Sequence, residues 1–499
     1  MRTGDSAASR PVVAQKSWRK SRGAKVGVQK GRGMIDHQFD QAGAPASGTA
    51  RLSLLAYLAF ALILPTDAFQ YGFGRLAMLL VFLGFLLVWC VWRTGLAAAE
   101  AWLFRQAWPI RLIAAVAVPL GVLAASFHSP HKVRVVEAGV IIVLAGWLAC
   151  GDVLAERWQG RKVPPSLVLP PLVLLLLALA VPLLNLVSGL SVYKLSDVAT
   201  TTVDAAHVLW HGANPWAAQI DAYGAINGHG AAYGGYKYLP LMIVAYLPFV
   251  LPFGASAVLW VDAAIVAAMA VLVWMLARRD AQGVPQAGMG LIAIAVLLAT
   301  PELAETSLAM GYNDALGMAL VLAAMVCWRR SAGLAGLLIG FSLSCKLMPG
   351  LVAMTLLFPA QRWKPYMLGL LAGLVPDMVV LAWAPLPFVR NVLLFNFVRL
   401  PDSTSWRMLA PGWVGRVASL AALAFWLGSS LLVLAAPRLP ALADLARLDR
   451  RMMLFVVAVL LLIITGSTAH DDYMIWWMPA ALALFARDRG THKGAAAFA

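Results

Sequence analysis

The run LVLPPLVLLLLALAVPLLNLVSGL (residues 167–190) decides the class of fold, because it is long, apolar and free of charged side chains. An α-helix needs about 20 such residues to cross a hydrocarbon core about 30 Å thick. Similar runs recur from Leu52 to Ala486 in a chain that is 61% hydrophobic and 12% charged. Few of them alternate apolar and polar residues as the strands of a membrane β-barrel would. The sequence therefore predicts an all-α polytopic membrane protein.

The apolar runs suggest the following spans: 52–70, 75–92, 109–127, 135–151, 167–190, 238–254, 256–276, 288–300, 314–328, 332–345, 347–358, 365–384, 412–435, 452–468 and 474–486. No fixed repeat and no second soluble domain interrupts them. We divide the chain into a disordered basic leader (1–50), an N-terminal transmembrane bundle (51–166), a main membrane domain (167–486) and a tail (487–499).

The net charge of +16 comes from basic residues in the leader and in short loops between spans. This is the distribution of cytoplasmic loops in membrane proteins, so we expect the bilayer and not a nucleic acid to be the partner of these charges. Both termini are then cytoplasmic. Because successive spans cross the membrane in alternate directions, four loops should lie together on the opposite, extracytoplasmic side. They are 191–236, 301–313, 385–411 and 469–473.

The segment 238–254 fits this scheme poorly. If it crossed fully, Arg278 and Arg279 would lie outside, against the usual preference for basic residues on the cytoplasmic side. Proline residues within it favour a re-entrant or broken helix, which is tolerated where it lines a cavity.

Asp197 follows the 167–190 run at the membrane boundary, where a lipid-borne donor and a polar acceptor can meet. Its carboxylate is suited to act as a general base on a hydroxyl group. The alternative is an N-cap for a helix from Val198 to Trp210, since Asp is a preferred cap residue. Asp204 shares the same helical face and is predicted to be solvated or structural.

The stretch Trp210-His-Gly-Ala-Asn-Pro-Trp216 is typical of a helix end. Gly212 can adopt the left-handed conformation after the last helical turn, and Pro215 prevents the helix from continuing. Trp216 and Tyr238 fit either an aromatic belt at the membrane interface or a surface that stacks on a sugar.

Basic side chains on the extracytoplasmic side are unusual, and an anionic ligand such as a phosphate would explain them. They are Lys237, Lys346, Arg390, Arg399 and Arg407. Ion pairs with Asp197, Asp314 or Asp402 are the alternative. Lys346 is the strongest candidate, because no acidic residue near it in the sequence can neutralise it.

Two further loops carry polar side chains between apolar spans. Glu305, Asn313 and Asp314 suggest a polar cavity, although Asp314 could cap the helix that follows it. His470 is suited to proton transfer or to pairing with a phosphate, and Tyr473 lies in the same turn.

Metal and cofactor motifs are not found. The pair Asp471-Asp472 lacks the DxD spacing, the four cysteines have no CxxC or Cys/His spacing, and no nucleotide-binding or hydrolase motif occurs. We therefore expect no metal, no disulfide framework and no cofactor.

Six short motifs follow one another between residues 190 and 486. They are Asp197, Gly212-Ala-Asn214-Pro215-Trp216, Tyr238-Leu-Pro240-Leu241, Gly311-Tyr-Asn313-Asp314, Ala335-Gly-Leu-Leu-Ile-Gly340 with Lys346-Leu-Met-Pro349, and His470 with Tyr473. Their order and spacing resemble the polyprenol-phosphate-sugar-dependent glycosyltransferases of the GT-C fold, most closely family 87, which includes bacterial α-1,2-mannosyltransferases. The chain departs from that family at Tyr312, where glutamine is usual, and at Lys237, where many members have no basic residue.

The resemblance implies a GT-C-like helical bundle with extracytoplasmic loops and short juxtamembrane helices, its catalytic domain being residues 167–486. It implies inverting transfer of a hexose, mannose above all, from a polyprenyl-phosphate sugar to a glycan or glycolipid acceptor at the outer face of a bacterial inner membrane. A multi-pass transporter or flippase of a lipid-linked or anionic substrate is the alternative, although a secondary transporter should show two similar halves.

The resemblance also assigns roles to residues. Asp197 and His470 would be catalytic, and the donor phosphate would bind Lys346, Lys237, Arg399 and Arg407. The residues that would contact sugar or acceptor are Asn214, Trp216, Tyr238, Glu305, Asn313, Asp314 and Tyr473.

Overall fold

The computed structural model describes residues 139–140, 171–192, 195–221, 233–278, 287–300, 303–399, 412–466 and 471–488. All of them belong to one compact unit, Ala46–Ala499. The leader, the predicted spans 52–70, 75–92 and 109–127, and most of 135–151 and of the tail lie outside the described residues.

The elements of this part of the chain are all helical, which confirms the predicted class of fold. They are α7 (Pro171–Ala178), α8 (Ala180–Val192), α9 (Asp197–Trp210), α11 (Pro240–Phe253), α12 (Ala257–Ala277), α13 (Ala287–Leu298), the π-helix η5 (Leu303–Ala309), α14 (Asp314–Cys327), α15 (Ala332–Leu343), α16 (Leu347–Leu356), η6 (Ala360–Arg362), α17 (Trp363–Gly373), α18 (Val375–Trp383), α19 (Pro385–Phe388), the π-helix η7 (Val389–Leu394), α20 (Phe395–Val398), α22 (Gly412–Ala435), η8 (Pro440–Ala446), α23 (Leu448–Thr465), η9 (Asp471–Trp476) and α24 (Met478–Asp488).

Three continuous helices in the described ranges are long and apolar enough to cross a membrane: Leu172–Ser191, α12 and α22. Each coincides closely with a predicted span, because an uninterrupted apolar run leaves little choice of helix boundary. Two bent pairs raise the number to as many as five, by length and composition.

The bends interrupt runs that the sequence suggests are continuous. The predicted span 365–384 is split into α17 and α18, which meet at 44°. Pro376 lies in the first turn of α18. A proline ring fits there but would break the interior of a continuous helix. Helix α13 meets η5 at 62°. Helix α11 has 14 residues, or about 21 Å at 1.5 Å per residue, which is shorter than a hydrocarbon core.

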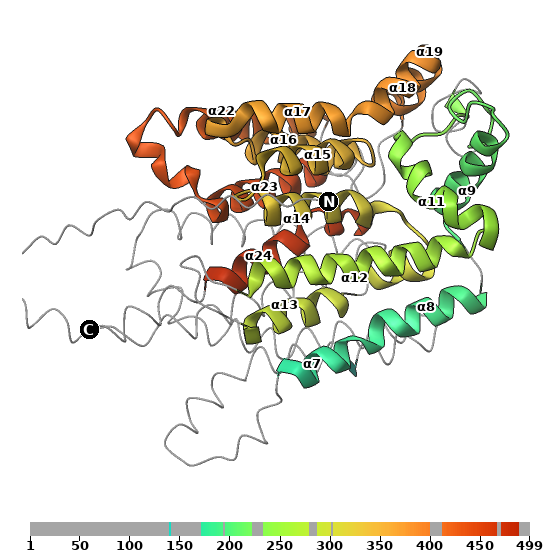
Figure 1. The fold of residues 1–499 in the computed structure, drawn as a ribbon, viewed down its shortest axis with the longest axis horizontal. Coiled ribbons are helices and arrows are strands. Elements are labelled where there is room, and N and C mark those ends of the chain that lie inside the picture. Colours follow the sequence, from blue (N-terminus) through green and yellow to red (C-terminus); the bar gives the residue numbers. More distant parts are fainter. Residues whose placement is uncertain are drawn as a thin grey trace, which may run out of the picture. The chain divides into compact units, whose positions relative to one another are not determined.

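Helix α12 lies between α13 and α14 and also contacts α11 and α24 (Figure 1). Helices α15 and α17 approach each other most closely through glycines. A Cβ atom at Gly336 would lie 2.0 Å from the carbonyl oxygen of Tyr366, and one at Gly369 would lie 2.0 Å from that of Gly333. Any larger side chain would force the two helices apart, as expected for packing between apolar helices.

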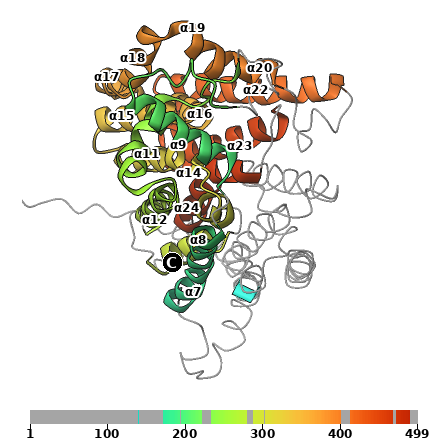
Figure 2. The same cartoon turned by 90° about the vertical axis from the view of Figure 1, so that its right-hand side faces the viewer.

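One end of the bundle carries the predicted polar insert. Helix α9 packs on α11, and α11 packs on α18. Figure 2, which faces this end, shows α19 and α20 above α9 and α11. The residues singled out from the sequence gather around these helices.

Candidate active site

Asp197 is the first residue of α9, and Ser196 caps the helix. The Ser196 hydroxyl oxygen accepts a hydrogen bond from the Ala199 N–H at 3.1 Å. The alternative interpretation of Asp197 as the N-cap is therefore wrong. The Asp197 side chain is exposed, and one of its oxygens accepts a hydrogen bond from the Val198 N–H at 2.9 Å. The other oxygen remains available to a ligand, and a carboxylate in the first helical turn is stabilised by the helix dipole.

The start of α9 is docked on the loop that precedes α14. The Ser196 N–H donates to the carbonyl oxygen of Met310 at 2.8 Å. Gly311 has a φ of 73°, and a Cβ atom there would lie 3.1 Å from that of Ala199. One turn further along α9, the Thr202 hydroxyl oxygen accepts from the Asn313 side-chain amide at 3.1 Å. These contacts place Asp197 next to the loop that ends at Asp314.

Lys346 and Asp314 form an ion pair with 2.9 Å between Nζ and Oδ1. Their side chains are only 12% and 3% exposed, so the pair is largely withdrawn from water. The Lys346 stem packs over Gly317, where a Cβ atom would lie 3.2 Å from that of Lys346. Of the ion pairs named as alternatives, the one with Asp314 is therefore confirmed for Lys346, and its partner is distant in the sequence.

Tyr238 connects the ion pair to Asp197. The Lys346 ammonium lies 4.4 Å from the centroid of the Tyr238 ring. Burial raises the pKa of Tyr238, and the nearby negative charges of Asp314 and Asp197 raise it further, followed by Tyr473. Lys346 thus contacts the Tyr238 ring, and the charges of Asp314, Asp197 and Tyr473 are close enough to raise its pKa.

Three buried oxygens of this site form no hydrogen bond in the described part of the chain. They are Asn313 Oδ1 and both carboxylate oxygens of Asp314, of which Oδ1 has only the ion-pair contact with Lys346. A buried acceptor without a donor costs about 1–3 kcal/mol, which a hydroxyl group of a ligand could recover.

Asn214 and Trp216 have structural contacts. The Asn214 side-chain oxygen accepts from the Trp216 N–H at 2.9 Å, which closes the turn after α9, and Gly212 has the expected positive φ of 76°. Trp216 is 1% exposed and donates from its indole nitrogen to the Tyr238 carbonyl oxygen at 3.0 Å. Its ring therefore has no free face for a sugar and instead supports Tyr238.

Lys237 and Lys346 contact different residues. Its ammonium donates to the carbonyl oxygens of Gly235, at 2.8 Å, and of Tyr233, and to the Asn391 side-chain oxygen at 2.9 Å. Arg399 shares the Phe395 ring with Lys237. Two of the cations assigned to the donor phosphate thus lie around Phe395 rather than on the Tyr238 ring.

The remaining predicted residues are less defined. Glu305 is half-buried in η5, one turn before Met310, and Tyr473 stacks on Trp476 with ring centroids 4.1 Å apart. Arg407 and His470 lie outside the described residues.

Sequence reasoning missed Asp262, which is fully buried in α12 and accepts a hydrogen bond from the Tyr246 hydroxyl. A single carboxylate inside an apolar span was the available signal. It also missed Asn391, whose amide donates to the Trp216 carbonyl oxygen at 2.9 Å while its oxygen binds Lys237. Nothing in the sequence around Asn391 indicates that role.

An apolar cavity of about 540 Å³ lies between α7, α8, α12, α13 and η5. Its lining includes Leu186, Val266, Trp274 and Leu308. Leu308 is two residues before Met310, whose carbonyl oxygen holds the start of α9. The cavity therefore extends to η5, two residues from the carbonyl group that holds the start of α9.

The apolar helices of the described residues are typical of a membrane protein. Residues 236–466 match the family model of glycosyltransferase family 87, which confirms the resemblance drawn from the motifs and supports a glycosyltransferase. The match begins just before Tyr238 and includes Asp314 and Lys346, whereas Asp197 precedes it. A search of curated proteins and a search of solved structures found no match.

Proposed function

We propose that the protein transfers a hexose, mannose above all, from a polyprenyl-phosphate sugar to a hydroxyl group of a glycan or glycolipid at the extracytoplasmic face of a bacterial inner membrane. The membrane and glycosyltransferase parts of this statement follow from the apolar helices and the family. The donor, the sugar and the face of the membrane are the proposal.

In the proposed step, the Asp197 carboxylate removes the proton of the acceptor hydroxyl. At the same time, the acceptor oxygen forms a bond to C1 of the sugar. The bond between C1 and the phosphate oxygen breaks on the opposite face, and polyprenyl phosphate leaves with the electron pair. The configuration at C1 is therefore inverted. General base catalysis of this kind is worth about 10²–10⁴ in rate.

The observation that carries this proposal is the arrangement around Tyr238. The ring has the Lys346 ammonium on one face and lies in the field of both Asp197 and Asp314. A base and a cation are thus held near one point by separate helices, which is the geometry that a hydroxyl and a leaving phosphate require.

Lys346 can bind the donor phosphate although it forms an ion pair with Asp314. An ammonium group has three donors, and Asp314 occupies one of them. Arg407 and His470 remain candidates for additional positive charge. The unsatisfied oxygens of Asn313 and Asp314 are suited to accept hydrogen bonds from sugar hydroxyls.

The apolar cavity that extends to η5 supports a lipid-linked donor. Its volume of about 540 Å³ and its aliphatic lining suit part of a polyprenyl chain. A nucleotide sugar would have no use for such a surface.

The test is transfer to a synthetic alkyl mannoside by the purified full-length protein. We expect product from a polyprenyl-phosphate hexose and none from the corresponding nucleotide sugar. Product from the nucleotide sugar alone would overturn the proposed donor.

A further inference from the structure

Two cations share the Phe395 ring of α20, and a third lies near one of them. The Lys237 ammonium lies 4.8 Å from the ring centroid and the Arg399 guanidinium lies 5.7 Å from it. Arg390, in η7, is close enough for its positive charge to lower the pKa of Lys237, although burial contributes more. We call Lys237, Arg390 and Arg399 the Phe395 cluster.

The charge of the Phe395 cluster is not balanced by the described chain. Asp221 lies 3.7 Å from the Lys237 ammonium and provides one negative charge against three positive ones. Neither arginine forms an ion pair with any described residue. Partly buried cations without counterions are unfavourable unless a ligand supplies the missing charge.

Within the described residues, the two arginines also have no hydrogen-bond partner. The Nε atoms of Arg390 and Arg399 are shut off from solvent, and in the described part of the chain they donate to no acceptor. Both side chains are half-buried, so they are already held in place without these bonds. A guanidinium group in that state is suited to bind phosphate oxygens in a bidentate manner.

The segment that carries the arginines is apolar and exposed. Leu386 is 67% exposed, Leu394 is 45% exposed and Phe397 is 86% exposed. Basic side chains beside exposed apolar ones are typical of segments that lie in the membrane interface and contact anionic lipids. The exposed side chains would receive lipid chains while the cations receive the headgroup.

We infer that the Phe395 cluster binds the phosphate group of a membrane lipid whose chains lie against the exposed apolar side chains of residues 385–398. The cluster shares no residue with the Lys346–Asp314 pair, and the inference does not depend on the proposed reaction. It assigns Lys237 and Arg399, expected at the donor phosphate, to a lipid site together with Arg390.

The test is native mass spectrometry of the full-length protein in a neutral detergent. The probes are dioleoyl phosphatidylglycerol, polyprenyl phosphate, inorganic phosphate and dioleoylglycerol, which has no phosphate. We expect at least one of the two lipid phosphates to bind, and the variant Arg390→Gln/Arg399→Gln to bind it at least about tenfold more weakly. The comparison of the two lipids identifies the source of the phosphate.

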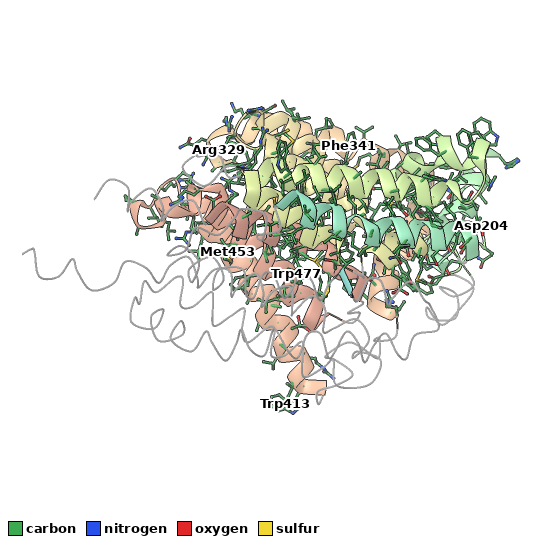
Figure 3. The ribbon with its side chains drawn as sticks, turned by 90° about the horizontal axis from the view of Figure 1, so that it is seen from below. Asp204, Arg329, Phe341, Trp413, Met453 and Trp477 are labelled. Atoms are coloured by element: carbon green, nitrogen blue, oxygen red, sulfur yellow. The ribbon has the colours of Figure 1, made fainter. Side chains whose placement is uncertain are left out.

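The control is Arg329→Gln/Arg330→Gln, which removes the same charge from two exposed arginines. Arg329 lies at the opposite end of the helices from Asp204 of α9 (Figure 3). The control should bind like the unmodified protein. Arg390→Lys/Arg399→Lys keeps the charge and should retain most of the affinity.

Three results would overturn the inference. The first is equal binding by the glutamine variant and the unmodified protein, and the second is an equal loss in the control. The third is binding of dioleoylglycerol or of inorganic phosphate alone. Neither arginine donates a hydrogen bond to a described residue, so the glutamine variant removes no such bond, and thermal unfolding in the same detergent checks that it is folded.

Discussion

The Lys346–Asp314 pair and the Phe395 cluster use similar side chains in opposite ways. The pair has one charge of each sign, both largely buried and 2.9 Å apart. The cluster has three positive charges and one negative charge, and its arginines have no hydrogen-bond partner among the described residues. In the first arrangement the two charges hold each other in position. In the second arrangement the positive charge is in excess and can bind an anionic ligand.

The largest effect is expected at the reaction site. Asp197→Asn keeps the size and hydrogen-bonding reach of the side chain but removes the base, so turnover should fall by about 10²–10⁴. Lipid binding by the Phe395 cluster should not change. The measurement is the rate of transfer by purified protein at saturating donor.

Asp204→Asn is the matched control, because Asp204 is exposed on the same helix, α9. It should leave the rate unchanged. Near-normal turnover in Asp197→Asn would mean that Asp197 only stabilises the helix, and the base would then be sought at Asp204, Glu305 or Asp314.

The second effect concerns stability. Lys346→Met leaves the Asp314 carboxylate buried without a partner and should lower the free energy of unfolding by about 3–5 kcal/mol. The double variant Lys346→Met/Asp314→Leu replaces both charges and should recover most of that loss without recovering transfer. Unfolding by titration with a denaturing detergent measures the difference.

The cluster should behave differently in the same experiment. Arg390→Gln/Arg399→Gln removes two unpaired charges and should change the free energy of unfolding by less than about 1 kcal/mol. A loss there as large as that of Lys346→Met would show that the cluster is a structural element, and the contrast between the two regions would fail.

Much of the helical framework could be predicted, whereas the sequence offered three acidic partners for the basic residues and could not select Asp314 for Lys346. The run 412–435 became α22 with the same bounds, because an apolar run determines its own helix. Lys346 and Asp314 lie on different helices, so only the packing of α14 against α16 brings them together. The sequence also could not show whether Ser196 or Asp197 caps α9, since both residue types are preferred at this position.

A smaller effect is expected at Gly311, where φ is 73° and a Cβ atom would meet Ala199 at 3.1 Å. Gly311→Ala should destabilise the protein by about 2–3 kcal/mol and reduce transfer, because it shifts the start of α9. Gly212→Ala is the control: its φ is 76°, but nothing lies within 4 Å of the added Cβ atom. It should cost about 1 kcal/mol and spare transfer. Equal effects at the two glycines would mean that the contact with Ala199 does not position Asp197.

The smallest effect is a pH dependence of the cluster. Burial lowers the pKa of Lys237 to about 8, with Asp221 opposing and Arg390 adding to the shift. The ammonium therefore loses its proton as the pH rises from 7 to 9. Binding of phosphatidylglycerol, whose phosphodiester does not titrate in this range, should weaken a few-fold. Binding that is constant from pH 7 to 9 would exclude the Lys237 ammonium from the lipid site.

Acceptor-dependent cleavage of the donor tests the central claim most directly. Purified protein is mixed with a polyprenyl-phosphate hexose, with and without an alkyl mannoside, and the released polyprenyl phosphate is quantified. The account predicts release with acceptor, in equal amount to the new glycoside, and almost none without it. Movement of the intact lipid across sealed vesicles, with no cleavage in either mixture, would contradict the account and favour a transporter.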